Sequence, residues 1–183
     1  MNHIKNILVS PRSEWPVIAE EPTDVASLYT GYIMPLSAIP AVCGLIGTAI
    51  IGIAGFRVPF GGALWHMVVQ YILGLVGVYV LALIVSKLAP TFGGREDQLQ
   101  ALKLVAYGAT ASWVGGIFMI IPLLGILSLI MSLYSLYILY CGTSVVMKVP
   151  QERALGYTVA VIVLAILAAI VIAVIGGLLV GHL

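Results

Sequence analysis

Charged side chains are scarce in this chain. Of its 183 residues, 8% are Asp, Glu, Lys or Arg and 62% are hydrophobic, and the mean hydropathy is +1.17. A soluble globular domain carries about 25% charged residues, so this composition supplies too little polar surface to face water. The shortage argues against a soluble domain and predicts an integral membrane protein whose first partner is the lipid bilayer. The net charge of +1, without any basic cluster, argues against nucleic acid as a partner.

The chain also lacks the clusters that catalysis, metal binding or ion coupling require. Cysteine occurs twice, at Cys43 and Cys141 in separate apolar runs, so we expect two small buried side chains and no disulfide. His66 lies in an apolar run without a neighbouring metal ligand. No Asp, Glu, Lys or Arg lies inside an apolar run away from its ends, which argues against a proton- or ion-coupled transporter. We therefore expect no enzymatic activity, no cofactor and no metal.

Five long apolar runs dominate the sequence. Each approaches the ~20 residues that a helix needs to cross a bilayer, and Pro122 with Gly125 marks a reversal between the third and the fourth. The runs cover residues 33–54, 63–88, 102–121, 123–147 and 157–180. They predict an all-α, polytopic membrane helix bundle with five transmembrane helices over residues 31–183, preceded by a lead-in over residues 1–30.

The lead-in contains a short amphipathic segment. Trp15 and Ile18 share one face of a predicted helix, and Glu14 is directed away from that face. An amphipathic segment with a Trp beside a span typically lies in the headgroup region, so we expect Trp15 and Ile18 at the membrane interface. Thr23 or Asp24 is expected to cap the helix that enters the bilayer.

Lysine and arginine are distributed unevenly between the two sides of the predicted bundle. Seven of the eight flank the lead-in, the second connection and the fourth connection, which all lie on one side, and Arg57 alone lies on the other. The side rich in Lys and Arg normally faces the cytoplasm. The distribution therefore predicts a cytoplasmic N-terminus and a C-terminus outside.

Small residues recur every four positions in two of the spans. They are Gly44, Thr48 and Gly52 in the first span and Ala169, Ala173 and Gly177 in the last. Such faces allow helices to approach closely, either within one chain or between two copies in a homo-oligomer. Ser128, Ser132 and Ser135 give the fourth span a similar face, which would either pack against a helix or line a path for a neutral solute.

Charged residues from separate segments are expected to meet on the predicted cytoplasmic face. The candidate docking surface consists of Glu14, Trp15, Glu20, Lys148, Glu152 and Arg153. Because the lead-in and the fourth connection are joined directly to spans, one of the lead-in acids should lie within pairing distance of Lys148 or Arg153. Two interpretations stay open. The charges either form a salt-bridged cap that seals the bundle, or bind a cytosolic protein or a lipid headgroup.

The order of these features resembles the Yip family, membrane proteins named for their interaction with Ypt/Rab GTPases. The resemblance rests on Pro11, Trp15, Ile18 and Glu20 in the lead-in, on five spans, and on the stretch from Tyr134 to Tyr157. For eukaryotic members it implies trafficking factors that bind prenylated Rab GTPases or organise membrane curvature. The short lead-in of this chain is more similar to that of the bacterial inner-membrane members.

These features together favour a non-enzymatic membrane scaffold or adaptor. We expect it in a bacterial inner membrane, with a Golgi or endoplasmic reticulum membrane as the alternative. The competing function is a small channel or transporter for a neutral or weakly polar solute. A continuous polar cavity through the bundle would favour the transporter, whereas a dry core beneath a charged cytoplasmic face would favour the scaffold.

Overall fold

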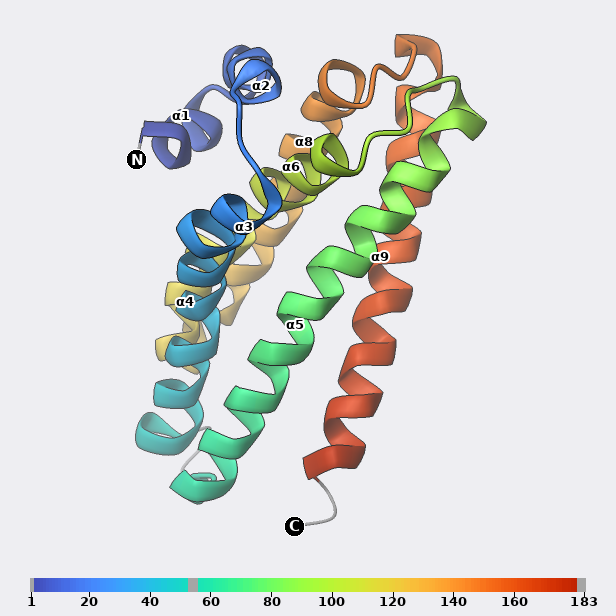
Figure 1. Ribbon diagram of the computed structural model, residues 1–183. Helices are drawn as coiled ribbons and strands as arrows, with labels where there is room; N and C mark the ends of the chain where they lie inside the picture. The colour runs from blue at the N-terminus through green and yellow to red at the C-terminus, as the bar shows by residue number, and fades with distance from the viewer. Residues whose placement is uncertain (1, 53–55, 181–183) are drawn as a thin grey trace.

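The computed structural model describes residues 2–52 and 56–180 and confirms an all-α bundle with five helices that could each cross a membrane (Figure 1). They are Val25–Ile51, Phe60–Phe92, Gln98–Ile120, Gly125–Val146 and Gln151–Leu178. Each helix overlaps one of the five apolar runs, because a run of that length and apolarity leaves the backbone no better partner than itself. Residue 54, the expected end of the first run, lies outside the described residues.

The first span is a continuous helix with two π-helical turns. It consists of α3 (Val25–Leu28), η1 (Tyr29–Ile33), α4 (Met34–Leu45) and η2 (Ile46–Ile51). Asp24 is its N-cap, as the sequence predicts, and accepts hydrogen bonds from the backbone N–H groups of Ala26 and Ser27. The Ser27 hydroxyl also donates to this carboxylate, and together these bonds lower the pKa of Asp24.

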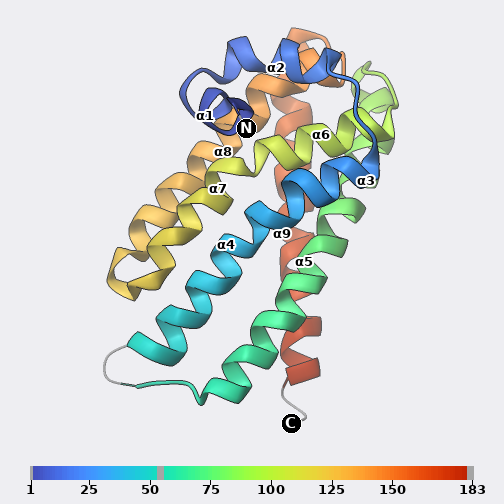
Figure 2. The same ribbon diagram turned by 60° about the vertical axis from the view of Figure 1, so that its left-hand side comes forward.

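Two long helices, α5 (Phe60–Leu88) and α9 (Gln151–Val180), run side by side along the bundle (Figures 1 and 2). They approach closely at two glycines. A Cβ atom at Gly77 would collide with Ile172, and one at Gly176 would collide with Gln70. After α5, the chain makes the 3-10 turn η3 (Ala89–Phe92) and leads into the third span.

The third and fourth spans form a helical hairpin. It consists of α6 (Gln98–Gly108), α7 (Thr110–Gly115), η4 (Gly116–Ile120), η5 (Pro122–Leu124) and α8 (Gly125–Val146). The reversal falls at η5, as predicted. Ser128 Oγ donates to Gly115 O at 2.8 Å, and Ser135 Oγ accepts from Ser112 N at 2.7 Å. The serine face of α8 therefore packs the hairpin, and its hydroxyls bond to the facing helix rather than to a solute path.

The lead-in folds as α1 (Asn2–Val9) and α2 (Pro11–Glu20), which lie across one end of the bundle (Figure 2). We call this the capped end; it also holds the connections 89–97 and 147–150. The connection between η2 and α5, which contains Arg57, and the η5 reversal lie toward the opposite end. Beneath the cap, all eight residues from Ala101 to Gly108 of α6 are buried, which makes α6 the centre of the core.

The small-residue face of the last span does not pack within the chain. Ala169, Ala173 and Gly177 are exposed, and a Cβ atom at Gly177 would meet nothing within 4 Å. The buried face of α9 instead carries Tyr157 and Val161. Of the two alternatives predicted for this face, packing within the chain is not found, and contact between two copies stays a prediction. Because both sides of a membrane helix are apolar, residue size alone does not reveal which side meets a neighbour.

The small-residue face of the first span is also not a helix contact. Gly44 faces open space, and the Thr48 hydroxyl bonds to Gly44 O of its own helix at 2.8 Å. Gly52 follows η2 with a φ of 84°, a backbone conformation that favours glycine. The close approach occurs at Gly47 instead, where a Cβ atom would collide with the carbonyl of Met119. Packing of this helix within the chain therefore does not use the predicted face; the close contact is at Gly47, one residue before Thr48.

Candidate functional site

Trp15 attaches the lead-in to the bundle. Its side chain is fully buried, and its indole Nε1 donates a hydrogen bond of 2.9 Å to Ile138 O on α8. The ring fits because Gly142, one turn along α8, has no side chain; a Cβ atom there would collide with the indole. Ile18 is buried as well. The apolar face of Trp15 and Ile18 is therefore covered by α8 and not by headgroups, and the position of this segment at the membrane interface stays a prediction.

Lys103 on α6 holds the C-terminal end of α2. Its side chain is buried, and Nζ donates to Ile18 O at 2.8 Å and to Glu21 O at 2.7 Å. Gln100 Nε2 donates to Ala19 O at 3.0 Å. The last carbonyls of a helix lack partners within it, and a cation beside them also complements the helix dipole. From the sequence alone, Lys103 is one of the basic residues beside a predicted span. Its apolar neighbours on both sides, Leu102 and Leu104, are the signal that could have revealed its buried position.

Glu14 is buried between the two lead-in helices. Its carboxylate lies 2.6 Å from His3 Nδ1, and His3 Nε2 lies 3.3 Å from the carboxylate of Glu21. His3 therefore links α1 to α2 at Glu14 and to Glu21, the residue that follows α2. Glu14 faces the inside of the cap, so the prediction that it is directed away from the packed face is wrong.

These positions correct the candidate docking surface. Because Glu14 and Trp15 are buried, their side chains are not available to contact a partner. Over residues 2–52 and 56–180, no ion pair joins Glu14 or Glu20 to Lys148 or Arg153. The predicted pairing across the face is therefore absent from that part of the chain. Glu20 remains exposed at the end of α2.

Two connections meet at the capped end and present the other charged residues. The Arg95 backbone N–H donates to Met147 O at 2.8 Å, and a Cβ atom at Gly93 would lie 3.7 Å from the Arg153 guanidinium. Lys148 turns the chain between α8 and α9 with a φ of 55°. We define the loop patch as four exposed residues: Arg95, Lys148, Glu152 and Arg153.

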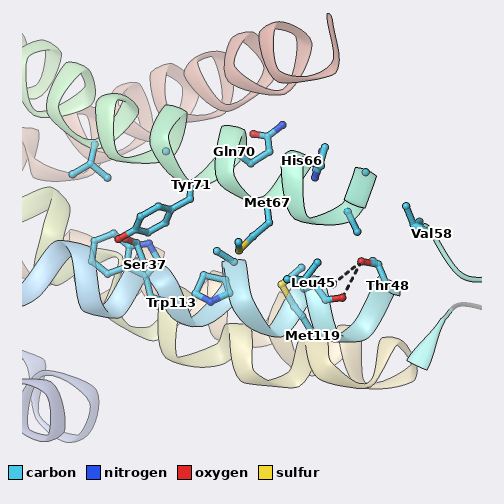
Figure 3. A pocket seen from close by; sticks show the side chains of 17 residues that line it. Ser37, Leu45, Thr48, Val58, His66, Met67, Gln70, Tyr71, Trp113 and Met119 are labelled. Carbon is cyan, nitrogen blue, oxygen red and sulfur yellow. Dashed lines mark hydrogen bonds between the residues drawn. The ribbon is translucent and has the colours of Figure 1, made fainter. Parts of the chain in front are cut away.

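A cavity of about 720 Å³ lies in the other half of the bundle, between α4, η2, α5 and the third span (Figure 3). Leu45, Met67 and Met119 lie around its middle, Tyr71 and Trp113 lie toward one end, and Thr48 and Val58 lie toward the other (Figure 3). The polar side chains that line it include Ser37, Thr48, His66, Gln70 and Tyr71. None of the described lining residues is Asp, Glu, Lys or Arg.

The cavity residues do not form a metal site. Within the described ranges, no three His, Cys, Asp or Glu side chains gather closely enough to share a metal ion. Cys43 is a buried free thiol and Cys141 a half-buried one. The buried position predicted for Cys43 is confirmed, and Cys141 is less buried than expected.

Comparison with known proteins gives a family match over nearly the whole chain. The Yip1 domain matches residues 5–173. The chain is 24% identical over 175 residues to "Inner membrane protein YohC" of Escherichia coli strain K12, covering 91% of this chain and 90% of that protein. The protein of the same name from Escherichia coli O6:H1 shows the same identity and coverage. No solved structure matches the chain.

Proposed function

The chain belongs to the Yip1 domain family, and from this membership we propose that it is a non-enzymatic membrane scaffold or adaptor that binds a cytosolic protein at the loop patch. We place it in a bacterial inner membrane, the location that the name of its relative states for that protein. The capped end and the N-terminus face the cytoplasm in this proposal, and the C-terminus lies outside. The uneven distribution of Lys and Arg supports this orientation.

One observation carries the proposal: two separate connections hold the loop patch together as one exposed surface. The hydrogen bond from Arg95 N to Met147 O fixes the second connection against the fourth. Three of the four patch residues, Arg95, Lys148 and Arg153, are basic, and Glu152 is the single acid. Exposed charges of one predominant sign favour a partner segment of opposite sign, so the expected partner presents acidic side chains.

The packed core beneath the cap supports a scaffold over a solute transporter. Near the capped end of the first span, the hydroxyl oxygens of Tyr32 and Thr110 form a hydrogen bond of 2.7 Å, and both residues are buried. Tyr107 packs against Tyr32 with ring centroids 4.3 Å apart. These contacts fill the space between the cavity and the capped end with side chains. A solute would have to displace them to pass through the bundle.

Charge reversal tests the proposal. A photocrosslinker at position 152 should capture a partner in native membranes, and Lys148→Glu with Arg153→Glu should remove that product, because like charges repel an acidic partner. Glu20→Lys should strengthen or leave unchanged the binding of an acidic segment. Since exposed ion pairs contribute only ~0–1 kcal/mol, these variants should still fold and insert.

Arg57→Glu, at the opposite end of the bundle, is the matched control and should leave the crosslinked product unchanged. If the double reversal gives the same products as the wild type, the docking proposal fails, and the loop patch is only a solvated surface.

A further inference from the structure

We propose that the cavity between α4 and α5 is a binding site for one acyl chain of a membrane phospholipid. It is independent of the loop patch, because the cavity occupies the half of the bundle away from the capped end. The lining comes from the first, second and third spans, so the site exists only once these helices have assembled.

The position of the cavity brings it into contact with lipid hydrocarbon. Its walls belong to helices long and apolar enough to span a bilayer. Large apolar residues next to the lining, including Val42 on α4 and Leu64 and Val68 on α5, are exposed on the surface of the bundle. Because the bilayer core supplies hydrocarbon and no water, an opening at this depth is filled by acyl chains.

The chemistry of the lining fits an uncharged, mostly apolar occupant. Leu45, Met67 and Met119 surround the middle of the cavity (Figure 3), and methionine side chains adapt to flexible ligands. A cavity of about 720 Å³ is within the range of small-molecule sites, which are typically apolar with a few polar groups. The described lining has no Lys or Arg to hold a phosphate, so the phospholipid headgroup stays outside and only its chain enters.

Missing side chains create much of the space. Gly44, Gly62 and Gly74 all line the cavity, and a Cβ atom at any of them would meet nothing within 4 Å. These glycines do not serve a close helix contact, unlike Gly47 or Gly116, where a Cβ atom would collide with a neighbouring backbone or proline. A glycine inside a helix is less favourable than alanine, so three of them around one open volume leave room for something other than this chain.

The two ends of the cavity define how the chain would lie. Toward one end, the Tyr71 hydroxyl donates to Met34 O at 3.0 Å and links α5 to α4. Toward the other, the Val58 backbone N–H donates to Thr48 O at 3.3 Å. The cavity therefore extends along α4 and α5, with one of these two hydrogen bonds toward each end. This shape suits an extended hydrocarbon chain more than a compact solute.

The test uses the full-length protein in nanodiscs that contain a phosphatidylcholine with a photoreactive diazirine in its acyl chain. The wild type should be labelled on residues of α4 and α5 that line the cavity. Gly44→Leu with Gly74→Leu should reduce this labelling about tenfold, because the added side chains occupy the same volume. Gly177→Leu is the matched control: it adds the same side chain at an open position outside the cavity and should change nothing.

Two outcomes would overturn the proposal. Labelling that stays unchanged in the filled variant, or that spreads evenly over the exposed face of α9, shows only lipid surrounding the bundle. If Gly44→Leu with Gly74→Leu does not fold, Gly62→Leu alone, at a position that is exposed and open, gives the same comparison. Loop-patch charge reversals should leave the labelling unchanged, so failure of the docking proposal remains separate.

Discussion

At the scale of single residues, long polar side chains link helices by donating to main-chain carbonyls. Trp15 bonds to Ile138 O, and the Tyr157 hydroxyl bonds to Val85 O at 2.6 Å. The Tyr134 hydroxyl reaches Leu8 O on α1 at 2.8 Å. A helical carbonyl retains a second lone pair after its own helix bond, so these links need no polar side chain on the partner. They let an apolar bundle use hydrogen bonds without placing charge in the bilayer.

Lys103→Met should weaken the attachment of the lead-in. The substitution keeps an unbranched side chain but removes the donors to Ile18 O and Glu21 O. Hydrogen bonds from charged groups contribute about 1.5–3 kcal/mol, so we expect a loss of this order in a detergent unfolding measurement. Limited proteolysis should also cut more readily between α2 and α3, because the end of α2 is no longer held.

Lys87→Met is the control for this prediction. The Lys87 ammonium is exposed and pairs with Glu96 at 2.5 Å, so its loss should change stability by only ~0–1 kcal/mol. Equal effects of the two substitutions would contradict the structural role assigned to Lys103.

At the scale of elements, α9 shows that a membrane helix carries two different apolar faces. One face packs against α5 through Gly176, where a Cβ atom would collide with Gln70. The other face contains Ala169, Ala173 and Gly177 and is exposed. The second face is free to meet lipid or another copy of the chain, so the homo-oligomer predicted from its spacing stays a prediction.

Substitutions at two adjacent glycines of α9, one on each face, test this assignment of the faces. Gly176→Leu should destabilise the bundle by ~1–3 kcal/mol, because the larger side chain is forced into the contact with Gln70. Gly177→Leu should leave the unfolding temperature in detergent nearly unchanged. The same loss of stability in both variants, measured at a concentration where the protein is monomeric, would contradict the assignment of the faces.

At the scale of the whole molecule, the bundle has two unlike ends. The capped end gathers α1, α2 and the loop patch over a packed core, and the cavity occupies the other half. Arg57 is at the end opposite to the cap, so the basic residues separate in space as they do in sequence. The odd number of spans also sends the start of the first span and the end of α9 to opposite ends of the bundle.

Cysteine labelling tests the orientation of this asymmetric molecule. In a variant with Cys43 and Cys141 replaced by alanine, a membrane-impermeant maleimide added to intact cells should label Val58→Cys. It should not label Thr91→Cys or Gln151→Cys, which lie at the capped end. All three positions are exposed and should react after the membrane is opened. Labelling of Thr91→Cys in intact cells would reverse the orientation.

The number, order and helical state of the spans follow from the sequence alone. An apolar run of ~20 residues has no stable place in water, and in lipid its backbone must bond to itself. Local chemistry was also readable, as in the N-cap at Asp24 and the reversal at η5. For the serine face of α8, the sequence left open a helix contact or a solute path, and the bond from Ser128 to Gly115 O shows the helix contact.

Which face of each helix meets a neighbour depends instead on how the helices are packed in three dimensions. In soluble proteins the buried face is the apolar one, but in a membrane the outward face is apolar too, so periodicity carries little information. From the sequence, Trp15 is expected to face the headgroups. The structure shows that its side chain packs against α8 at Gly142 instead. The cavity depends on glycines from α4 and α5 that are far apart in sequence. Their common open volume arises only when the two helices lie together, because a space between helices belongs to neither of them.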